Sequence, residues 1–215
     1  MIISPGRKYI FVHIPKTGGT ALSLALENRA MKDDILIGDT PKAVKRRRRL
    51  KDVKTAGRLW KHSSLADIDG LISLQDLDDF LIFTLVRNPW DRMVSYYHWL
   101  RMQSFDHPAV DLARRLEFVD FLAHPQTQSS IRATPYGHYL RDASGQERTA
   151  LFVRLEHLSE DLVPLETHLG FRLDEVPRAN TSYRNANHRS YYTENTQELV
   201  ADLCKADIER FGYRF

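Results

Sequence analysis

Residues 8–27 read KYIFVHIPKTGGTALSLALE, and they indicate the class of fold. The segment 8–14 is mainly β-branched, aromatic and apolar and is ended by Pro15, which predicts a buried strand. Residues 21–27 are mostly helix formers, so a helix is expected after the strand. A short loop with two adjacent glycines joins them. The sequence therefore predicts a strand, a glycine loop and a helix in direct succession.

A second unit of the same kind begins at Phe80. Residues 80–86, FLIFTLV, are continuously apolar, as expected of a central parallel strand that is covered on both faces. The segment 89–103, PWDRMVSYYHWLRMQ, predicts a helix. Asn88 suits its N-cap, Pro89 suits its first position, and Asp91 lies near the positive end of the helix dipole.

The rest of the chain continues the alternation of strands and helices. A strand is expected at 151–155, and helices are expected at 116–123, 159–169 and 193–211. This pattern predicts an α/β fold with a central, mainly parallel sheet. Because no internal repeat or long linker divides the chain, we expect a single domain over residues 1–215. Ligands of such folds bind beyond the carboxyl ends of the strands.

Composition and charge set limits on the protein class. The chain has 215 residues, a formal net charge of +3 and one cysteine, Cys204. No apolar run approaches the roughly 18 residues of a membrane span, and the N-terminus does not resemble a secretory signal. One cysteine excludes an internal disulfide and argues against a thiolate zinc site, so we expect a cytoplasmic protein with no metal site.

Residues 42–54 form a strongly basic run, with Asp52 as its single acid. Its cations are Lys42, Lys45, Arg46, Arg47, Arg48, Arg49, Lys51 and Lys54. Such a run can bind nucleic acid or another polyanion, and it can equally be a solvated helix face or a loop. The sequence leaves both interpretations open.

The loop at residues 14–20, IPKTGGT, has the features of a phosphate-binding loop. Gly18 and Gly19 allow a tight turn that points successive N–H groups into one concavity, and the following helix adds its N-terminal N–H groups. Lys16 supplies a mobile positive charge, and threonine hydroxyls can donate as well. The loop is not a Walker motif, because its lysine precedes the glycines. The alternative is an ordinary strand–helix turn.

A second anion-binding motif follows the second strand. Arg87 stands at the end of a buried strand, where its guanidinium needs an anion or an acid as partner. Ser95 lies about two turns into the next helix. Together these two side chains can bracket a second phosphate. A salt bridge for Arg87 and a surface position for Ser95 are the alternatives.

Taken together, these motifs resemble the PAPS-dependent sulfotransferases (PAPS, 3′-phosphoadenosine-5′-phosphosulfate), in particular the carbohydrate branch related to heparan 2-O-sulfotransferases and similar bacterial proteins. FVHIPKTGGTAL is similar to the family's 5′-phosphosulfate loop, and FTLVRNPWDRMVSYYHWL is similar to its 3′-phosphate motif. RLEHL at 154–158 and DIERFGYRF at 207–215 resemble two further family segments. The resemblance implies a P-loop-like, three-layer α/β/α fold. Residues 30–60 and 101–150 match nothing in the family pattern.

The resemblance also implies roles for individual residues. Lys16 would contact the sulfuryl group and the oxygen of the leaving 5′-phosphate, which makes it catalytic. The other residues that would hold PAPS are Pro15, Thr17, Gly18, Gly19 and Thr20 at the 5′ end, and Arg87 and Ser95 at the 3′-phosphate. His62 is the candidate general base, because relatives carry a similar K-H-x-[ST] segment between the two motifs. A neutral imidazole suits that task near pH 7.

The reaction expected is transfer of a sulfuryl group from PAPS to an acceptor hydroxyl, without a metal. The branch resemblance implies a carbohydrate or glycolipid acceptor, with neither nucleic acid nor a membrane span involved. Three rivals remain: a small P-loop-type kinase, which would need Mg²⁺ and ATP, a non-catalytic polyanion-binding protein, and a sulfotransferase-like protein that has lost activity. The sequence does not indicate the oligomeric state.

Overall fold

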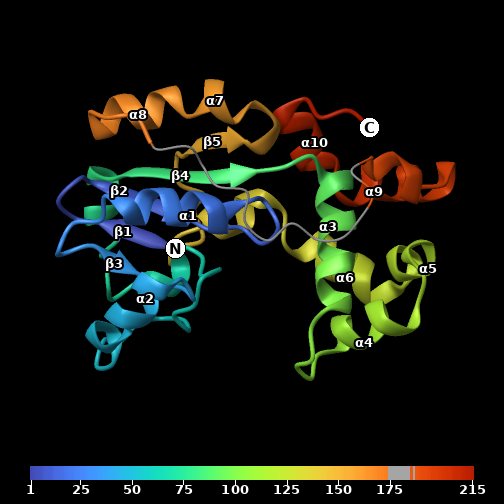
Figure 1. The fold of residues 1–215 in the computed structure, drawn as a ribbon, viewed down its shortest axis with the longest axis horizontal. Coiled ribbons are helices and arrows are strands. Elements are labelled where there is room, and N and C mark those ends of the chain that lie inside the picture. Colours follow the sequence, from blue (N-terminus) through green and yellow to red (C-terminus); the bar gives the residue numbers. More distant parts are fainter. Residues whose placement is uncertain (174–184, 186) are drawn as a thin grey trace. The chain divides into compact units, whose positions relative to one another are not determined.

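The computed structural model describes residues 1–173, 185 and 187–215 (Figure 1). The chain divides into two compact units. The first comprises residues 1–86 and 136–180, and the second comprises residues 87–135 and 181–215. Each unit has a hydrophobic core of its own, and the predicted N-terminal succession of strand, loop and helix lies in the first.

The first unit is built on a five-stranded sheet in the order β3-β1-β2-β4-β5. Its strands are β1 (Ile2–Ser4), β2 (Tyr9–Val12), β3 (Ile35–Leu36), β4 (Leu81–Val86) and β5 (Leu151–Arg154). The neighbours β2, β4 and β5 run parallel, whereas β1 is antiparallel to both β2 and β3. The predicted α/β fold with a central parallel sheet is confirmed. The antiparallel edge made by β1 and β3 was not predicted.

Both faces of this sheet are covered, which explains the continuously apolar strands. Side chains alternate between the faces, as the period of two requires. On one face, Phe11 and Phe83 pack with Leu22 of α1 (Gly19–Asn28) and Leu165 of α8 (Val163–Leu169). On the other face, Ile10 and Ile82 pack with side chains from the short turns η2 (Ala66–Ile68), η3 (Asp76–Asp79) and η4 (Tyr136–Leu140). Helices α1 and α8 therefore form the layer on one side of the sheet, and short 3₁₀ turns form the layer on its other side.

The remaining elements of the first unit are α2 (Pro41–Arg46), η1 (Arg47–Leu50), η5 (Leu155–His157) and α7 (Leu158–Asp161). The helix expected at 159–169 is in fact two helices, α7 and α8, which meet at Leu162. Pro164 lies in the first turn of α8, where its missing N–H breaks the hydrogen-bond ladder of a continuous helix. Gly170 ends α8 in the left-handed conformation, as predicted.

The second unit is helical. Its elements are α3 (Pro89–Arg101), α4 (Pro108–Arg115), α5 (Phe118–Ala123), α6 (Pro125–Ala133), η6 (His188–Tyr191), α9 (Glu194–Leu203) and α10 (Lys205–Phe211). The predicted start of α3 is correct: the side chain of Asn88 accepts a hydrogen bond from the N–H of Trp90 at 3.1 Å. Val94 and Tyr97 of α3 pack in the core with Phe121 and Val200.

The single helix expected at 193–211 is also divided in two. α9 and α10 meet at Cys204, whose backbone angles (φ −109°, ψ 18°) lie outside the α-helical region. Thr193 begins α9 with a capping box that includes Thr196. Cys204 is buried in the core of this unit, and burial raises the pKa of its thiol to about 12.

Candidate active site

The loop between β2 and α1 is tightly wound. Lys16 and Gly18 both adopt the left-handed conformation, with φ values of 66° and 91°. Gly18 is the N-cap of α1, so the helix begins directly at the loop and presents its positive dipole end there. For Lys16, which carries a Cβ atom, the left-handed conformation costs roughly 1–2 kcal/mol. Strain of this kind is typical of ligand-binding loops.

Thr17 braces this loop from inside. Its side chain is fully buried, and its hydroxyl donates a hydrogen bond to the main-chain oxygen of Ile14 at 2.9 Å. The hydroxyl is therefore engaged within the loop, and the group that Thr17 can offer to an anion is its main-chain N–H. Thr20, in the first turn of α1, is partly exposed.

Gly19 is required because the ring of His13 packs directly against it. A Cβ atom at position 19 would lie 2.2 Å from Cδ2 of His13, closer than real side chains approach. His13 is 6% exposed, and burial is the main reason that its pKa is held well below its usual value. His13 therefore supports the loop.

His62 lies beside His13, in the first unit. Its Nδ1 is 2.7 Å from the main-chain oxygen of His13, and the two imidazole rings meet edge to face with 4.7 Å between centroids. A carbonyl oxygen only accepts hydrogen bonds, so Nδ1 of His62 carries the proton and Nε2 is left with its lone pair. Burial lowers the pKa of His62 from 6.5 to about 4, although the bond to His13 opposes this effect.

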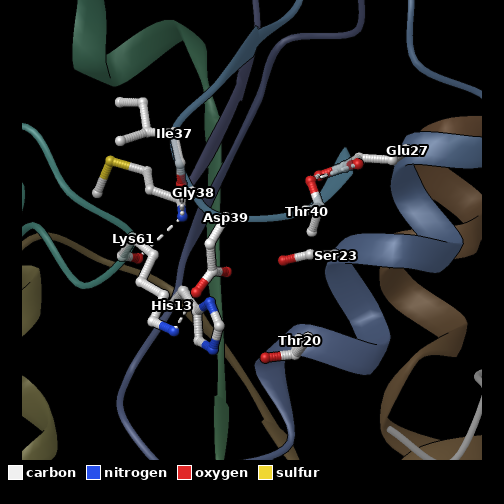
Figure 2. Close-up of a pocket in the computed structure, with 10 residues that line it drawn as sticks. His13, Thr20, Ser23, Glu27, Ile37, Gly38, Asp39, Thr40 and Lys61 are labelled. Atoms are coloured by element: carbon white, nitrogen blue, oxygen red, sulfur yellow. Dashed lines mark hydrogen bonds and ion pairs between the residues drawn. The ribbon is translucent and has the colours of Figure 1, made fainter. Parts of the chain in front are cut away.

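A small polar pocket adjoins the loop (Figure 2). Its volume of about 10 Å³ is room for about one water molecule. Thr20 and Ser23 of α1 face Asp39 and Lys61 across the pocket, and His13 closes its lower end. Lys61 and Asp39 form an ion pair at 2.6 Å. Sequence reasoning did not single out Asp39, because the segment that follows β3 carries no motif. It also did not single out Ser23, which lies within the stretch taken only as a helix.

The second predicted motif belongs to the second unit. Arg87 directs Nε and Nη2 at one oxygen of Asp91, at 2.8 and 2.5 Å, and the two side chains are 14% and 21% exposed. The ion pair that the sequence left open for Arg87 is therefore present, with Asp91 as its acid. Ser95 is buried on α3. Lys16 and His62 lie in one unit, and Arg87 and Ser95 lie in the other.

The basic run 42–54 is partly engaged in holding the chain together. Arg46 donates to the main-chain oxygens of Met31 and Asp34, and Arg49 donates to that of Lys32. The side chains of Lys45 and Arg48 are exposed. Some of these cations therefore fix the segment between α1 and α2, whereas others face the solvent.

Within residues 1–173, 185 and 187–215, no helix has both the length and the apolar character needed to cross a membrane. Nor does this described part contain a group of three or more His, Cys, Asp or Glu side chains that could hold a metal ion.

Comparison with known proteins identifies the family. A sequence model described as the sulfotransferase family matches residues 1–214. Among solved structures, the chain is similar to the mouse sulfotransferase SULT7A1 complexed with PAP, with a TM-score of 0.50 and 13% sequence identity. This match covers 96% of the present chain and 86% of the mouse chain, and at that identity it supports the fold.

No curated protein is significantly similar in sequence. The family match covers nearly the whole chain and includes both motifs from which the resemblance was inferred. The chain therefore belongs to the sulfotransferase family, as its two motifs predicted.

Proposed function

We propose that this sulfotransferase uses PAPS to sulfate a hydroxyl of a carbohydrate, with Lys16 and His62 as its catalytic residues. The observation that carries the proposal is the hydrogen bond from Nδ1 of His62 to the oxygen of His13. This hydrogen bond connects His62, whose Nε2 retains its lone pair and can act as a base, to His13, whose ring supports the glycine loop. Membership of the family supports PAPS as the co-substrate.

The glycine loop is proposed to hold the 5′-phosphosulfate end of PAPS. The main-chain N–H groups of the loop and of the first turn of α1 would bind the phosphate oxygens, since they lie at the positive end of the helix dipole. Cofactor binding is therefore assigned to Lys16, Thr17, Gly18, Gly19 and Thr20. Pro15, which has no N–H to donate, is assigned to the same site as the first residue of the loop after Ile14. Arg87 and Ser95 are proposed to bind the 3′-phosphate, and the pair with Asp91 would keep the guanidinium of Arg87 oriented.

In the proposed reaction Nε2 of His62 accepts the proton of the acceptor hydroxyl as its oxygen attacks the sulfur. The bond between sulfur and the 5′-phosphate oxygen breaks, and that oxygen leaves with its electron pair. The ammonium of Lys16 stabilises the negative charge that develops on the leaving phosphate. The products are 3′,5′-ADP and a sulfate ester, and His62 returns its proton to water.

The low pKa of His62 fits this role in the absence of ligand. At about 4 it leaves the imidazole neutral at physiological pH, which is the form that a base requires. Binding of the highly negative PAPS nearby would raise that pKa, since opposite charges favour the protonated form. The base would then become stronger when the co-substrate is in place.

Three further expectations accompany this proposal. The acceptor is proposed to be a carbohydrate or glycolipid, on the resemblance to the carbohydrate branch. A cytoplasmic location is proposed from the single cysteine. Residues 1–215 are proposed to form one sulfotransferase domain, because the family match runs through both units.

Calorimetric titration tests the nucleotide specificity. We expect 3′,5′-ADP to bind more tightly than ADP without Mg²⁺, and Arg87→Ala to abolish that preference. Arg114→Ala, which removes an exposed arginine of α4, is the matched control and should leave both affinities unchanged. Equal binding of the two nucleotides, or binding of ADP that requires Mg²⁺, would contradict the proposal and favour a kinase.

A further inference from the structure

Trp60 is a large apolar side chain that the fold leaves in solvent next to the candidate base. Its side chain is 47% exposed, whereas Trp90 in the second unit is 4% exposed. The indole meets the His62 ring edge to face, with 5.0 Å between centroids and 85° between planes. Scattered exposed apolar residues are ordinary on protein surfaces, so its position beside His62 is what distinguishes this one.

A buried serine fixes the backbone that carries Trp60. The side chain of Ser63 is fully buried, and its hydroxyl accepts a hydrogen bond from the N–H of Trp60 at 3.0 Å. The same oxygen lies 3.0 Å from the main-chain oxygens of Arg58 and Trp60, either of which can accept its proton. The N–H of Ser63 returns a bond to the oxygen of Trp60. These hydrogen bonds fix the backbone of the turn that holds Trp60 in its exposed position.

The residue after Trp60 is also held. The main-chain oxygen of Lys61 accepts a hydrogen bond from the N-terminal nitrogen of Met1 at 2.9 Å. The side-chain ammonium of Lys61 pairs with Asp39. The Asp39 side chain is 61% exposed, so its carboxylate can accept further hydrogen bonds from a ligand. Trp60 thus contacts the His62 ring, and Asp39 pairs with Lys61, the residue before His62.

We propose that Trp60 contacts the acceptor, stacking its exposed face on the apolar C–H face of a sugar ring whose hydroxyl is presented to His62. This rests on the proposed function and specifies the acceptor as a pyranose bound through one face. Asp39 accepts hydrogen bonds from neighbouring hydroxyls of the same ring. A combination of one rigid apolar anchor and few polar groups is how small-molecule sites fix the orientation of a ligand.

The test compares sugars with phenols as acceptors. Wild-type protein with [³⁵S]PAPS is assayed against a panel of methyl glycosides and neutral hexasaccharides, and against simple phenols at matched concentrations. The proposal predicts that sugars are sulfated. Trp60→Ala should then raise the acceptor KM at least about tenfold with little change in kcat, the loss expected for a central aromatic anchor. In Trp60→Phe, the acceptor KM should return most of the way to the wild-type value.

Two measurements separate this inference from the proposed function and from folding. The affinity for 3′,5′-ADP and the thermal unfolding midpoint should be the same in Trp60→Ala and wild type. Phe105→Ala removes a similarly exposed aromatic side chain from the second unit and should leave the acceptor KM unchanged. An unchanged KM in Trp60→Ala, sulfation of phenols alone, or no sulfation of any sugar would overturn the inference. Binding of 3′,5′-ADP would still support the nucleotide site.

Discussion

Nδ1 of His62 lies 2.7 Å from the main-chain oxygen of His13, the residue that follows β2 and whose ring packs against Gly19. One residue thus connects the candidate base to the glycine loop, its oxygen holding His62 and its ring supporting the loop. The hydrogen bond also decides which nitrogen of His62 is available.

His62→Asn keeps a side-chain donor for the oxygen of His13 but removes Nε2. If Nε2 is the general base, kcat should fall by about 10²–10⁴-fold, while the affinity for 3′,5′-ADP should not change. Steady-state kinetics and calorimetry measure the two quantities. His138→Asn, at an exposed position in the same unit, is the control. A kcat within a few-fold of wild type would exclude His62 as the base.

The partly buried His62 should make the protein less stable in acid. Its pKa is about 4 when folded and near 6.5 when unfolded, so the unfolded chain binds a proton first as the pH falls. For this residue alone, the free energy of unfolding should be about 2 kcal/mol lower at pH 5 than at pH 7.5. Urea denaturation at both values measures it. In His62→Asn the pH dependence should be smaller by that amount, and an unchanged dependence would contradict the burial of a neutral imidazole.

Lys16 combines a chemical role with a strained backbone, and two substitutions separate them. Lys16→Ala and Lys16→Gly both remove the ammonium, so both should lose sulfuryl transfer by at least about a hundredfold. Glycine adopts a positive φ without strain, whereas alanine does not, so Lys16→Gly should be about 1 kcal/mol more stable than Lys16→Ala. Denaturant unfolding compares the two variants. Activity retained in either variant would remove Lys16 from the mechanism.

Gly19→Ala should disrupt both the loop and the support beneath it. The added methyl group would lie 2.2 Å from the His13 ring, so the ring or the loop must shift, at a cost of about 1–3 kcal/mol. Gly38→Ala is the matched control for stability, because its Cβ would meet its nearest neighbour at 3.8 Å. Thermal unfolding and the affinity for 3′,5′-ADP report the two effects. Equal stability of the two variants would show that His13 does not restrain Gly19.

The elements that the sequence predicted well are those with strong local signals. β4 is a long apolar run, and α3 begins with an Asn–Pro pair whose capping geometry is the one expected. By contrast, β1 and β3 contain three and two residues, too few to show a period, and they exist because they pair with each other and with β2. The breaks at Leu162 and Cys204 were missed because the apolar pattern continues across both of them.

The sequence proposed the residues of the candidate site, but it did not indicate most of the contacts among them. The glycine loop, Arg87 and His62 were identified from motifs, because each motif is a short, continuous stretch of the sequence. The partnership of His62 with His13 and that of Lys61 with Asp39 join residues 49 and 22 positions apart. Such contacts are created by the fold. The burial that lowers the pKa of His62 could not be inferred for the same reason.

The central claim, that this chain transfers the sulfuryl group of PAPS, is tested most directly by following the label of [³⁵S]PAPS into a sugar acceptor. The wild type should form a labelled ester and one equivalent of 3′,5′-ADP in the absence of metal, and Lys16→Ala should form neither. No transfer by the wild type, or transfer of label from [γ-³²P]ATP with Mg²⁺ instead, would contradict the account.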